Sequence, residues 1–207
     1  MSPELVKQQS EETLKKHHIS VDESLPCIES ESELVPQSAH DVATRVVILS
    51  YMVGVGYGES GPQLKKALEK YDLYRATSPE EQRLLSADKL SEQEIIDATW
   101  LAECIQALAW SLGRTDLDPF KDRDFDLSKL PDPFTDPARF ITSATLRPFD
   151  ELYQQADLHY RLHWAAIDCR VKNVTSLVDE SVVRERRKAL EWVIGVEADW
   201  DAVPLDT

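Results

Sequence analysis

The stretch ADLHYRLHWAAIDCR, residues 156–170, decides the fold class of this chain. At about 100° per residue, its apolar side chains fall on two opposite sides of a helix, with two narrow polar edges between them. A helix that is apolar on two sides is predicted to be packed between other elements and not to lie on a surface. One polar edge carries Asp157, Arg161 and Asp168, and the other carries His159, His163 and Arg170.

Local start signals divide the rest of the chain into further helices. Ser78 with Glu81, and Ser91 with Glu94, have the spacing of a capping box, in which the two side chains close the first turn. The predicted helices cover residues 2–16, 40–53, 62–71, 92–112, 148–172 and 176–194, with a further one that starts at Ser78. The predicted fold is therefore all-α, a single-domain array of about seven helices over residues 1–207.

Two segments lack a helical pattern. Residues 19–37 are rich in acids and contain Pro26 and Pro36, so we expect an extended acidic segment after the first helix. Residues 113–145 contain four prolines and many aspartates, which predicts a long irregular arm.

The composition is strongly acidic. Thirty-eight acidic residues against 23 basic ones give a net charge of −15. Such a chain is repelled by nucleic-acid backbones and anionic membranes, so we expect it to bind neither and to attract a basic partner. The three cysteines are far apart and form no CxxC motif, and the first residues lack an apolar stretch, which predicts a reducing, cytoplasmic location.

Several segments together resemble a known bacterial family. They are TWLAECIQALAWSLGRTDLDPF (99–120), LRPFDELYQQADLHYRLHWA (146–165), VVRERRKALEWV (182–193) and DWDAVPLDT (199–207). With these motifs the chain resembles the "domain of unknown function 4272" family over most of its length. One departure is Leu101 between Trp100 and the glutamate Glu103, where the family usually has an arginine after the tryptophan. The resemblance implies one bacterial domain and brings no activity, cofactor or site residue with it.

The charged residues of the central helix admit two interpretations. Asp157 and Arg161 are four residues apart, a spacing that allows an ion pair, and Glu103 is a further candidate partner, with Arg147 and Arg184 as alternatives. This interpretation predicts a buried ion network that holds helices together. The other interpretation places Glu103, His159, Arg161 and His163 around one pocket as the catalytic candidates of an enzyme.

Other motifs are incomplete. His159 and His163 have a spacing that allows a shared metal, but no motif supplies further ligands. The GxGxxG string at 56–61 lacks the flanking strands of a dinucleotide site, so we expect an interhelical loop. Asp122, Asp124 and Asp126 alternate as in a calcium loop that lacks its glycine and its final glutamate. No metal and no cofactor is predicted.

We expect a non-enzymatic binding module, in its concrete form an immunity- or antitoxin-like inhibitor of a basic bacterial partner. An enzyme with an unfamiliar site and a structural subunit of an oligomer are the alternatives, and the sequence leaves the oligomeric state open. The predicted binding residues are the acids of two segments. They are Asp22, Glu23, Glu29, Glu31 and Glu33 in the first, and Asp116, Asp118, Asp122, Asp124 and Asp126 in the second.

Overall fold

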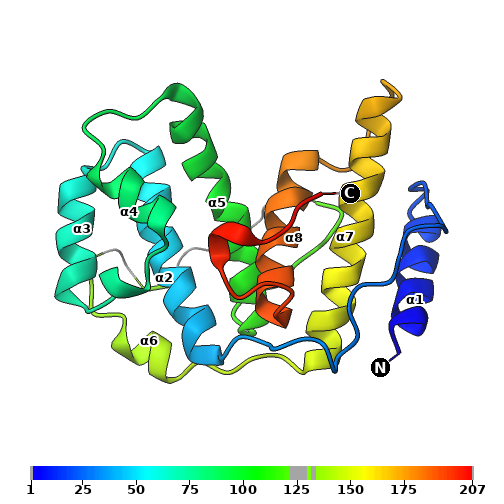
Figure 1. Cartoon of the computed structure of the whole chain (residues 1–207), viewed down its shortest axis with the longest axis horizontal. Coiled ribbons are helices and arrows are strands. Elements are labelled where there is room, and N and C mark those ends of the chain that lie inside the picture. Colours follow the sequence, from blue (N-terminus) through cyan, green and yellow to red (C-terminus); the bar gives the residue numbers. More distant parts are fainter. Residues whose placement is uncertain (1, 122–129, 132–133, 207) are drawn as a thin grey trace.

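The computed structural model describes residues 2–121, 130–131 and 134–206, and it contains helices and no strands within these ranges (Figure 1). The elements are α1 (Pro3–Lys16), α2 (Ala39–Gly56), α3 (Gly61–Lys70), η1 (Tyr74–Ala76), α4 (Pro79–Ser86), α5 (Glu92–Ser111), α6 (Ala138–Thr142), α7 (Phe149–Val171), α8 (Glu180–Ile194) and η3 (Trp200–Ala202). The predicted all-α helical array is confirmed, with α6 as one helix more than the sequence indicated.

The helices pack as a row across the molecule, from α3 and α4 at one end to α1 at the other (Figure 1). In the middle, α5 packs between α2 and α8, and α8 in turn packs against α7. The main core lies here because α2 and α5 are apolar over most of their circumference, as Val46, Leu49, Ile105 and Leu108 show. Full burial of each such aliphatic side chain contributes about 1.5–3 kcal/mol.

Helix α7 lies between α8 and α1, as its two-sided pattern predicted. The side that carries Leu158 and Leu162 is buried and meets Leu14 of α1 and Val183 of α8. The opposite side is less enclosed, because Tyr160 and its neighbours Trp164 and Ile167 are only half-buried. The helix is therefore packed on two sides, with one side sealed and the other partly open.

The predicted capping boxes are confirmed, and some helix boundaries differ from those predicted. Both capping boxes form, so that Ser78 and Ser91 cap α4 and α5. Helix α8 begins at Glu180 and not at Ser176, because the Asp179 carboxylate accepts the N–H groups that open the helix. The predicted irregular arm contains the short helix α6, and α2 runs three residues beyond its predicted end, to Gly56.

The GxGxxG string is the turn between two helices, as predicted. Gly56 ends α2 and Gly61 opens α3. A Cβ atom at Gly61 would lie 2.6 Å from the carbonyl oxygen of Leu85, so a side chain is excluded there by close approach of α4. The glycine therefore serves helix packing, and the helix that precedes it is not the strand that a dinucleotide site needs.

Among the described residues, no helix has both the length and the apolar character that crossing a bilayer demands.

Gly195 joins α8 to the C-terminal segment in a way that only glycine permits. Its φ is 88°, and an added Cβ would lie 2.1 Å from the carbonyl oxygen of Val35. We expect Gly195→Ala to lower the free energy of unfolding by about 2 kcal/mol or more, because it adds a clash to the strain of a left-handed residue. Gly58→Ala is the control: Gly58 has a φ of 87° with nothing within 4 Å, so only the strain of about 1 kcal/mol applies. Equal losses for both variants in urea denaturation would contradict the packing argument.

Candidate functional site

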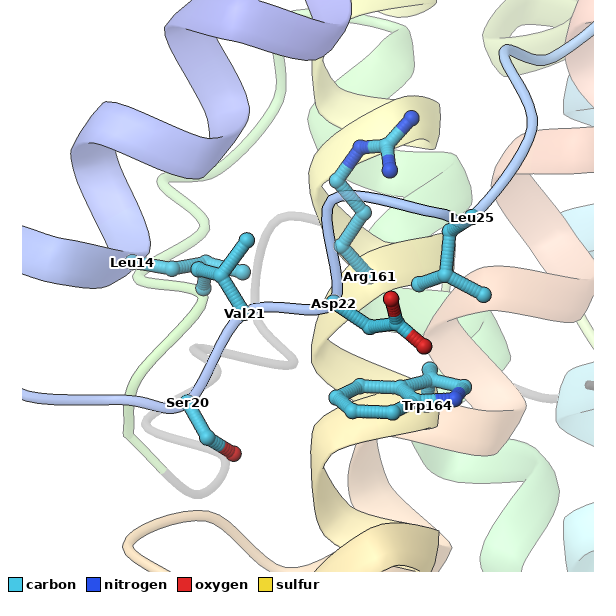
Figure 2. A pocket seen from close by; sticks show the side chains of 7 residues that line it. All are labelled: Leu14, Ser20, Val21, Asp22, Leu25, Arg161 and Trp164. Atoms are coloured by element: carbon cyan, nitrogen blue, oxygen red, sulfur yellow. The ribbon is translucent and has the colours of Figure 1, made fainter.

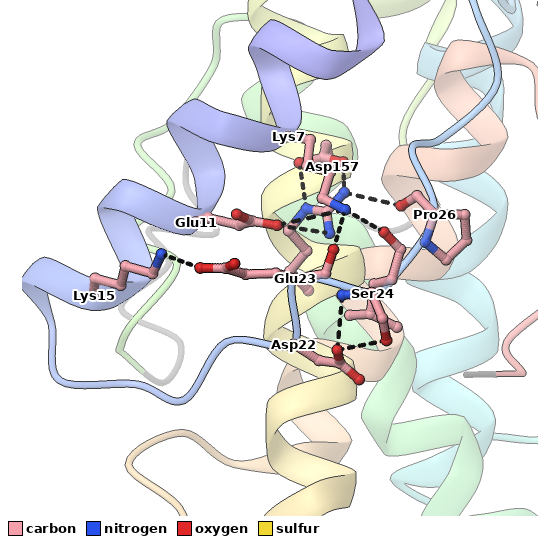
Figure 3. A network of polar contacts seen from close by, with 10 residues as sticks. Lys7, Glu11, Lys15, Asp22, Glu23, Ser24, Pro26 and Asp157 are labelled. Carbon is pink, nitrogen blue, oxygen red and sulfur yellow. Dashed lines mark hydrogen bonds and ion pairs between the residues drawn. The ribbon is translucent and has the colours of Figure 1, made fainter.

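Arg161, a predicted catalytic candidate, is fully buried in an ion pair on α7. Its Nε and Nη2 donate to the two carboxylate oxygens of Asp157, each at 2.9 Å. Nη2 also donates to the carbonyl oxygen of Pro26, and Glu11 of α1 lies 3.8 Å from Nη1. Figure 3 shows this network where α1 and the segment after it meet α7. The predicted pair is confirmed, and it ties three parts of the chain together.

Glu103, the second candidate, pairs with an arginine that the sequence did not suggest. Its carboxylate accepts from Arg186 of α8 at 2.9 Å, and not from Arg161, Arg147 or Arg184. Arg186 also donates to the side chain of Gln106. The remaining guanidinium nitrogen donates to two backbone carbonyls at the start of the arm, those of Asp118 and Lys121.

His163, the third candidate, contacts Arg187 of α8, which follows Arg186 in the sequence. Because an arginine can only donate, Nδ1 of His163 accepts from Nη1 of Arg187 at 3.0 Å, and the imidazole is neutral. Burial lowers the pKa of His163 to about 4, and the charge of Arg187 acts in the same direction. Arg187 also pairs with Glu191 and donates to the carbonyl oxygen of Asp206 in the C-terminal segment. Burial raises the pKa of Glu191 to about 7 against the attraction of Arg187.

His159, the fourth candidate, is fully buried one turn before His163. Its Nδ1 donates to the carbonyl oxygen of Gln155 at 2.9 Å, while Nε2 has no hydrogen-bond partner among the residues that the structure describes. Burial lowers the pKa of His159 to about 3, so the ring stays neutral. Within the described residues no group of three or more histidine, cysteine, aspartate or glutamate side chains is arranged to hold a metal ion.

The structure therefore places the four candidates in the interior, each at most 5% exposed and each with its own partners. Glu103 and Arg161 are held in separate ion pairs, on Arg186 and Asp157. None of the four side chains is at the surface in this conformation. Glu103, Arg161 and His163 connect α5 to α8, α7 to α1 and α7 to α8, whereas, among the described residues, His159 bonds only within α7.

A small pocket beside Arg161 does not change this assignment. It is bounded by Leu14 and the segment 20–25 on one side and by Arg161 and Trp164 on the other (Figure 2). It has no room for a water-sized molecule. Figure 2 also shows the guanidinium of Arg161 pointing away from the Trp164 ring.

The predicted acidic binding residues are spread over two places. Glu23, Glu29, Glu31 and Glu33 are exposed and Asp22 is half-exposed, along the segment that links α1 to α2. In the arm, Asp116 and Asp118 are exposed, and the Asp118 carboxylate lies 3.2 Å from the ammonium of Lys121. The other three predicted acids of the arm, Asp122, Asp124 and Asp126, lie outside the described residues.

An open groove that the sequence did not predict lies between α4, α5 and α8. We call it the α4–α5–α8 groove, with a volume of about 510 Å³. Its apolar floor is formed by Leu84, Trp100, Leu101 and Trp200. Acids of α4, α5 and η3 line one side, which we call the acidic wall, and charged side chains of α8 line the other, which we call the basic wall. The acidic wall contains Glu80, Glu81, Glu94, Asp97 and Asp201, and the basic wall contains Arg184, Lys188 and the acid Glu185.

Helix capping and stacking position the groove. Glu94 is fixed by the capping box of α5 and Trp200 by two cations, because Arg45 and Lys188 lie over its ring at 5.2 and 4.7 Å. The Asp201 carboxylate accepts the N–H of Glu80 and so joins η3 to α4. One feature of the sequence could have indicated the groove. The first turns of α5 carry apolar side chains that are not buried: Ile96 is exposed, and Trp100, one turn later, is only half-buried.

The protein is all-α, and its buried ion pairs hold helices together. The acidic segment between α1 and α2 and the α4–α5–α8 groove lie at its surface. A family model described as "Domain of unknown function (DUF4272)" matches residues 6–203, and the chain belongs to this family. No curated protein and no solved structure matches the chain.

The Asp157–Arg161 pair makes a direct prediction about stability. We expect Arg161→Met to lower the free energy of unfolding by about 3–5 kcal/mol, because Asp157 would remain buried without its partner. Arg170→Met is the matched control on the same helix: Arg170 pairs with Glu180 at the surface, so we expect less than about 1 kcal/mol. A loss at Arg161 as small as that at Arg170 in urea denaturation would refute the structural role.

His159 predicts a dependence of stability on pH. Because its pKa is lowered from 6.5 to about 3 on folding, the unfolded chain takes up a proton below pH 6.5 and the folded chain does not. Stability is therefore lost as the pH falls from 6.5 toward 3. By pH 5 this group alone costs about 2 kcal/mol relative to pH 7. We expect the free energy of unfolding of His159→Leu to fall by about 2 kcal/mol less than that of the wild type over this interval. An equal fall in both proteins would contradict the assignment.

Proposed function

We propose that this protein is a non-enzymatic binding module that captures a basic protein partner. The observation that carries the proposal is the acidic strip, the carboxylates of the extended segment between α1 and α2. Its members are Asp22, Glu23, Glu29, Glu31 and Glu33. Because the backbone of this segment is already held in place, binding of a cationic surface to its carboxylates costs little further backbone entropy.

Three side chains of α1 and α7 hold the backbone of the acidic strip through its carbonyl oxygens. The Lys7 ammonium donates to the carbonyl oxygens of Glu23 and Leu25, and Arg161 donates to that of Pro26. The Tyr153 hydroxyl donates to the carbonyl oxygen of Glu29 at 2.8 Å. These contacts use carbonyl groups only, so the carboxylates of Glu23 and Glu29 stay at the surface, where that of Glu23 pairs with the exposed Lys15 at 2.9 Å.

The distribution of charge supports the same proposal. Among the described residues, four arginines and six carboxylic acids are buried, so the interior holds little of the net charge of −15. The acidic excess therefore lies at the surface, where it accelerates encounter with a basic protein. An immunity- or antitoxin-like inhibitor, which caps a basic partner, is the concrete form of this proposal.

The test compares capture of proteins from a lysate of the host by the wild type and by Glu23→Lys/Glu29→Lys. We expect the wild type to recover a partner with a pI above about 9 at low salt and to release it in about 0.5 M salt, where the Debye length is only a few ångströms. The double variant keeps both carbonyl contacts and should lose the partner.

Glu69→Lys/Asp88→Lys is the matched control, because both side chains are exposed and lie away from the acidic strip. It makes the same charge change and should retain the partner. Recovery of no basic protein, or equal loss in both double variants, would count against the proposal.

A further inference from the structure

We propose that the α4–α5–α8 groove is a second docking surface for this basic partner, in addition to the acidic strip. It takes a segment that presents apolar side chains with lysines or arginines along one edge only. The inference rests on the proposed function and adds to it the place of docking and the chemistry of the bound segment. It differs from the sequence-based expectation, which placed the contact on the acidic strip and the arm.

The floor of the groove is suited to apolar anchors. Trp100 and Leu101 are only half-buried, although they lie on the helix that supplies much of the core. Leu84 of α4 completes the floor, and the ring of Trp200 in η3 lies beneath it with only 4% of its surface exposed. Aromatic and aliphatic surface of this kind, enclosed by a polar rim, is where protein interfaces gain most of their affinity.

The acidic wall is short of cations. Within the described part of the chain, neither Asp97 nor Asp201 is in an ion pair: Asp97 accepts from the amide of Gln93, and Asp201 from a backbone N–H. Glu80 and Glu94 share a single cation, that of Arg83. Glu81 also lines this wall and is paired with Arg45. The other four carboxylates share one arginine, which leaves an excess of negative charge that a lysine or arginine of a partner would complement.

The basic wall limits which partners fit. Arg184 is paired with Glu185, and the Lys188 ammonium lies over the ring of Trp200 at 4.7 Å. Both nonetheless repel a cation that is placed next to α8. A uniformly cationic stretch is therefore disfavoured, and the bound segment carries its positive charge on the edge that faces α4 and α5.

The probe is a 12-residue helical peptide with leucines on one face, lysines along one edge and glutamates along the other. Two reference peptides replace the lysines by glutamates or the leucines by serines. Binding is followed by fluorescence anisotropy and by the indole N–H signals in NMR spectra. The chain has five tryptophans, of which Trp100 and Trp200 line the groove and Trp110 and Trp164 do not. We expect the first peptide to bind and to shift the signals of Trp100 and Trp200.

Two substitutions test the walls and the floor separately. Asp97→Lys reverses one of the unpaired acids, and Trp100→Ala removes part of the floor, so each should weaken binding of the peptide at least tenfold. Glu92→Lys is the matched control for Asp97→Lys, because it makes the same charge change on an exposed residue of α5 that does not line the groove. It should change the affinity less than twofold.

Three results would overturn the inference. They are no binding of the peptide up to 1 mM, equal binding of the serine reference peptide, and shifts confined to Trp110 or Trp164. If the peptide binds but responds only to Glu23→Lys/Glu29→Lys, the groove is not a docking surface and the proposed function still stands. If the host partner is also not recovered, both proposals fail.

Discussion

A buried guanidinium has five N–H donors, and one carboxylate can accept only two of them well. Much of this structure follows from that constraint. Arg45, Arg161, Arg186 and Arg187 are buried, and each is paired with a carboxylate: Glu81, Asp157, Glu103 and Glu191. Each arginine also donates to a backbone carbonyl outside the long helices. These carbonyls belong to Ala76, Pro26, Asp118 with Lys121, and Asp206.

The arginines thereby order the connections between helices. The segment 17–37 and the C-terminal segment each reach the core with a few side chains, Ile28 and Leu34 in the first and Trp200 and Val203 in the second, and the arginines add polar attachments to this burial. A charge-assisted hydrogen bond from a fixed guanidinium gives each segment one strong attachment. The neutral His159 and His163 belong to the same interior, because burial and the neighbouring arginines disfavour their protonation.

The buried polar contacts also determine which residues are available for function. Glu103 and His163, which were catalytic candidates in the sequence, use their polar atoms in contacts that stabilise the fold. The surface features on which the proposed function rests are the acidic strip and the α4–α5–α8 groove. One is ordered by Arg161 through the carbonyl of Pro26, and the other by Arg45 through the ring of Trp200. The surface chemistry thus depends on the buried arginines without using them directly.

Interactions that are local in sequence could be predicted, and distant ones could not. The Ser78–Glu81 box and the Asp157–Arg161 pair connect residues three and four apart, so helical geometry alone brings them together. Glu103 and Arg186 are 83 residues apart, and other arginines were equally eligible before the helices were placed. The groove needs Glu80 beside Asp201, 121 residues later, and no local pattern encodes that contact. Helix α6 was missed because it is only five residues long and lies among prolines.

The most direct measurement is hydrogen–deuterium exchange of the wild type and Arg161→Lys, read by segment. Lysine keeps the positive charge beside Asp157 and loses the fork that also reaches the carbonyl of Pro26. The account predicts faster exchange in residues 22–30, with the amides of α2 and α5 and the start of the arm unchanged. Unchanged exchange in residues 22–30, or a uniform increase over the whole chain, would contradict the claim that each buried arginine holds its own segment.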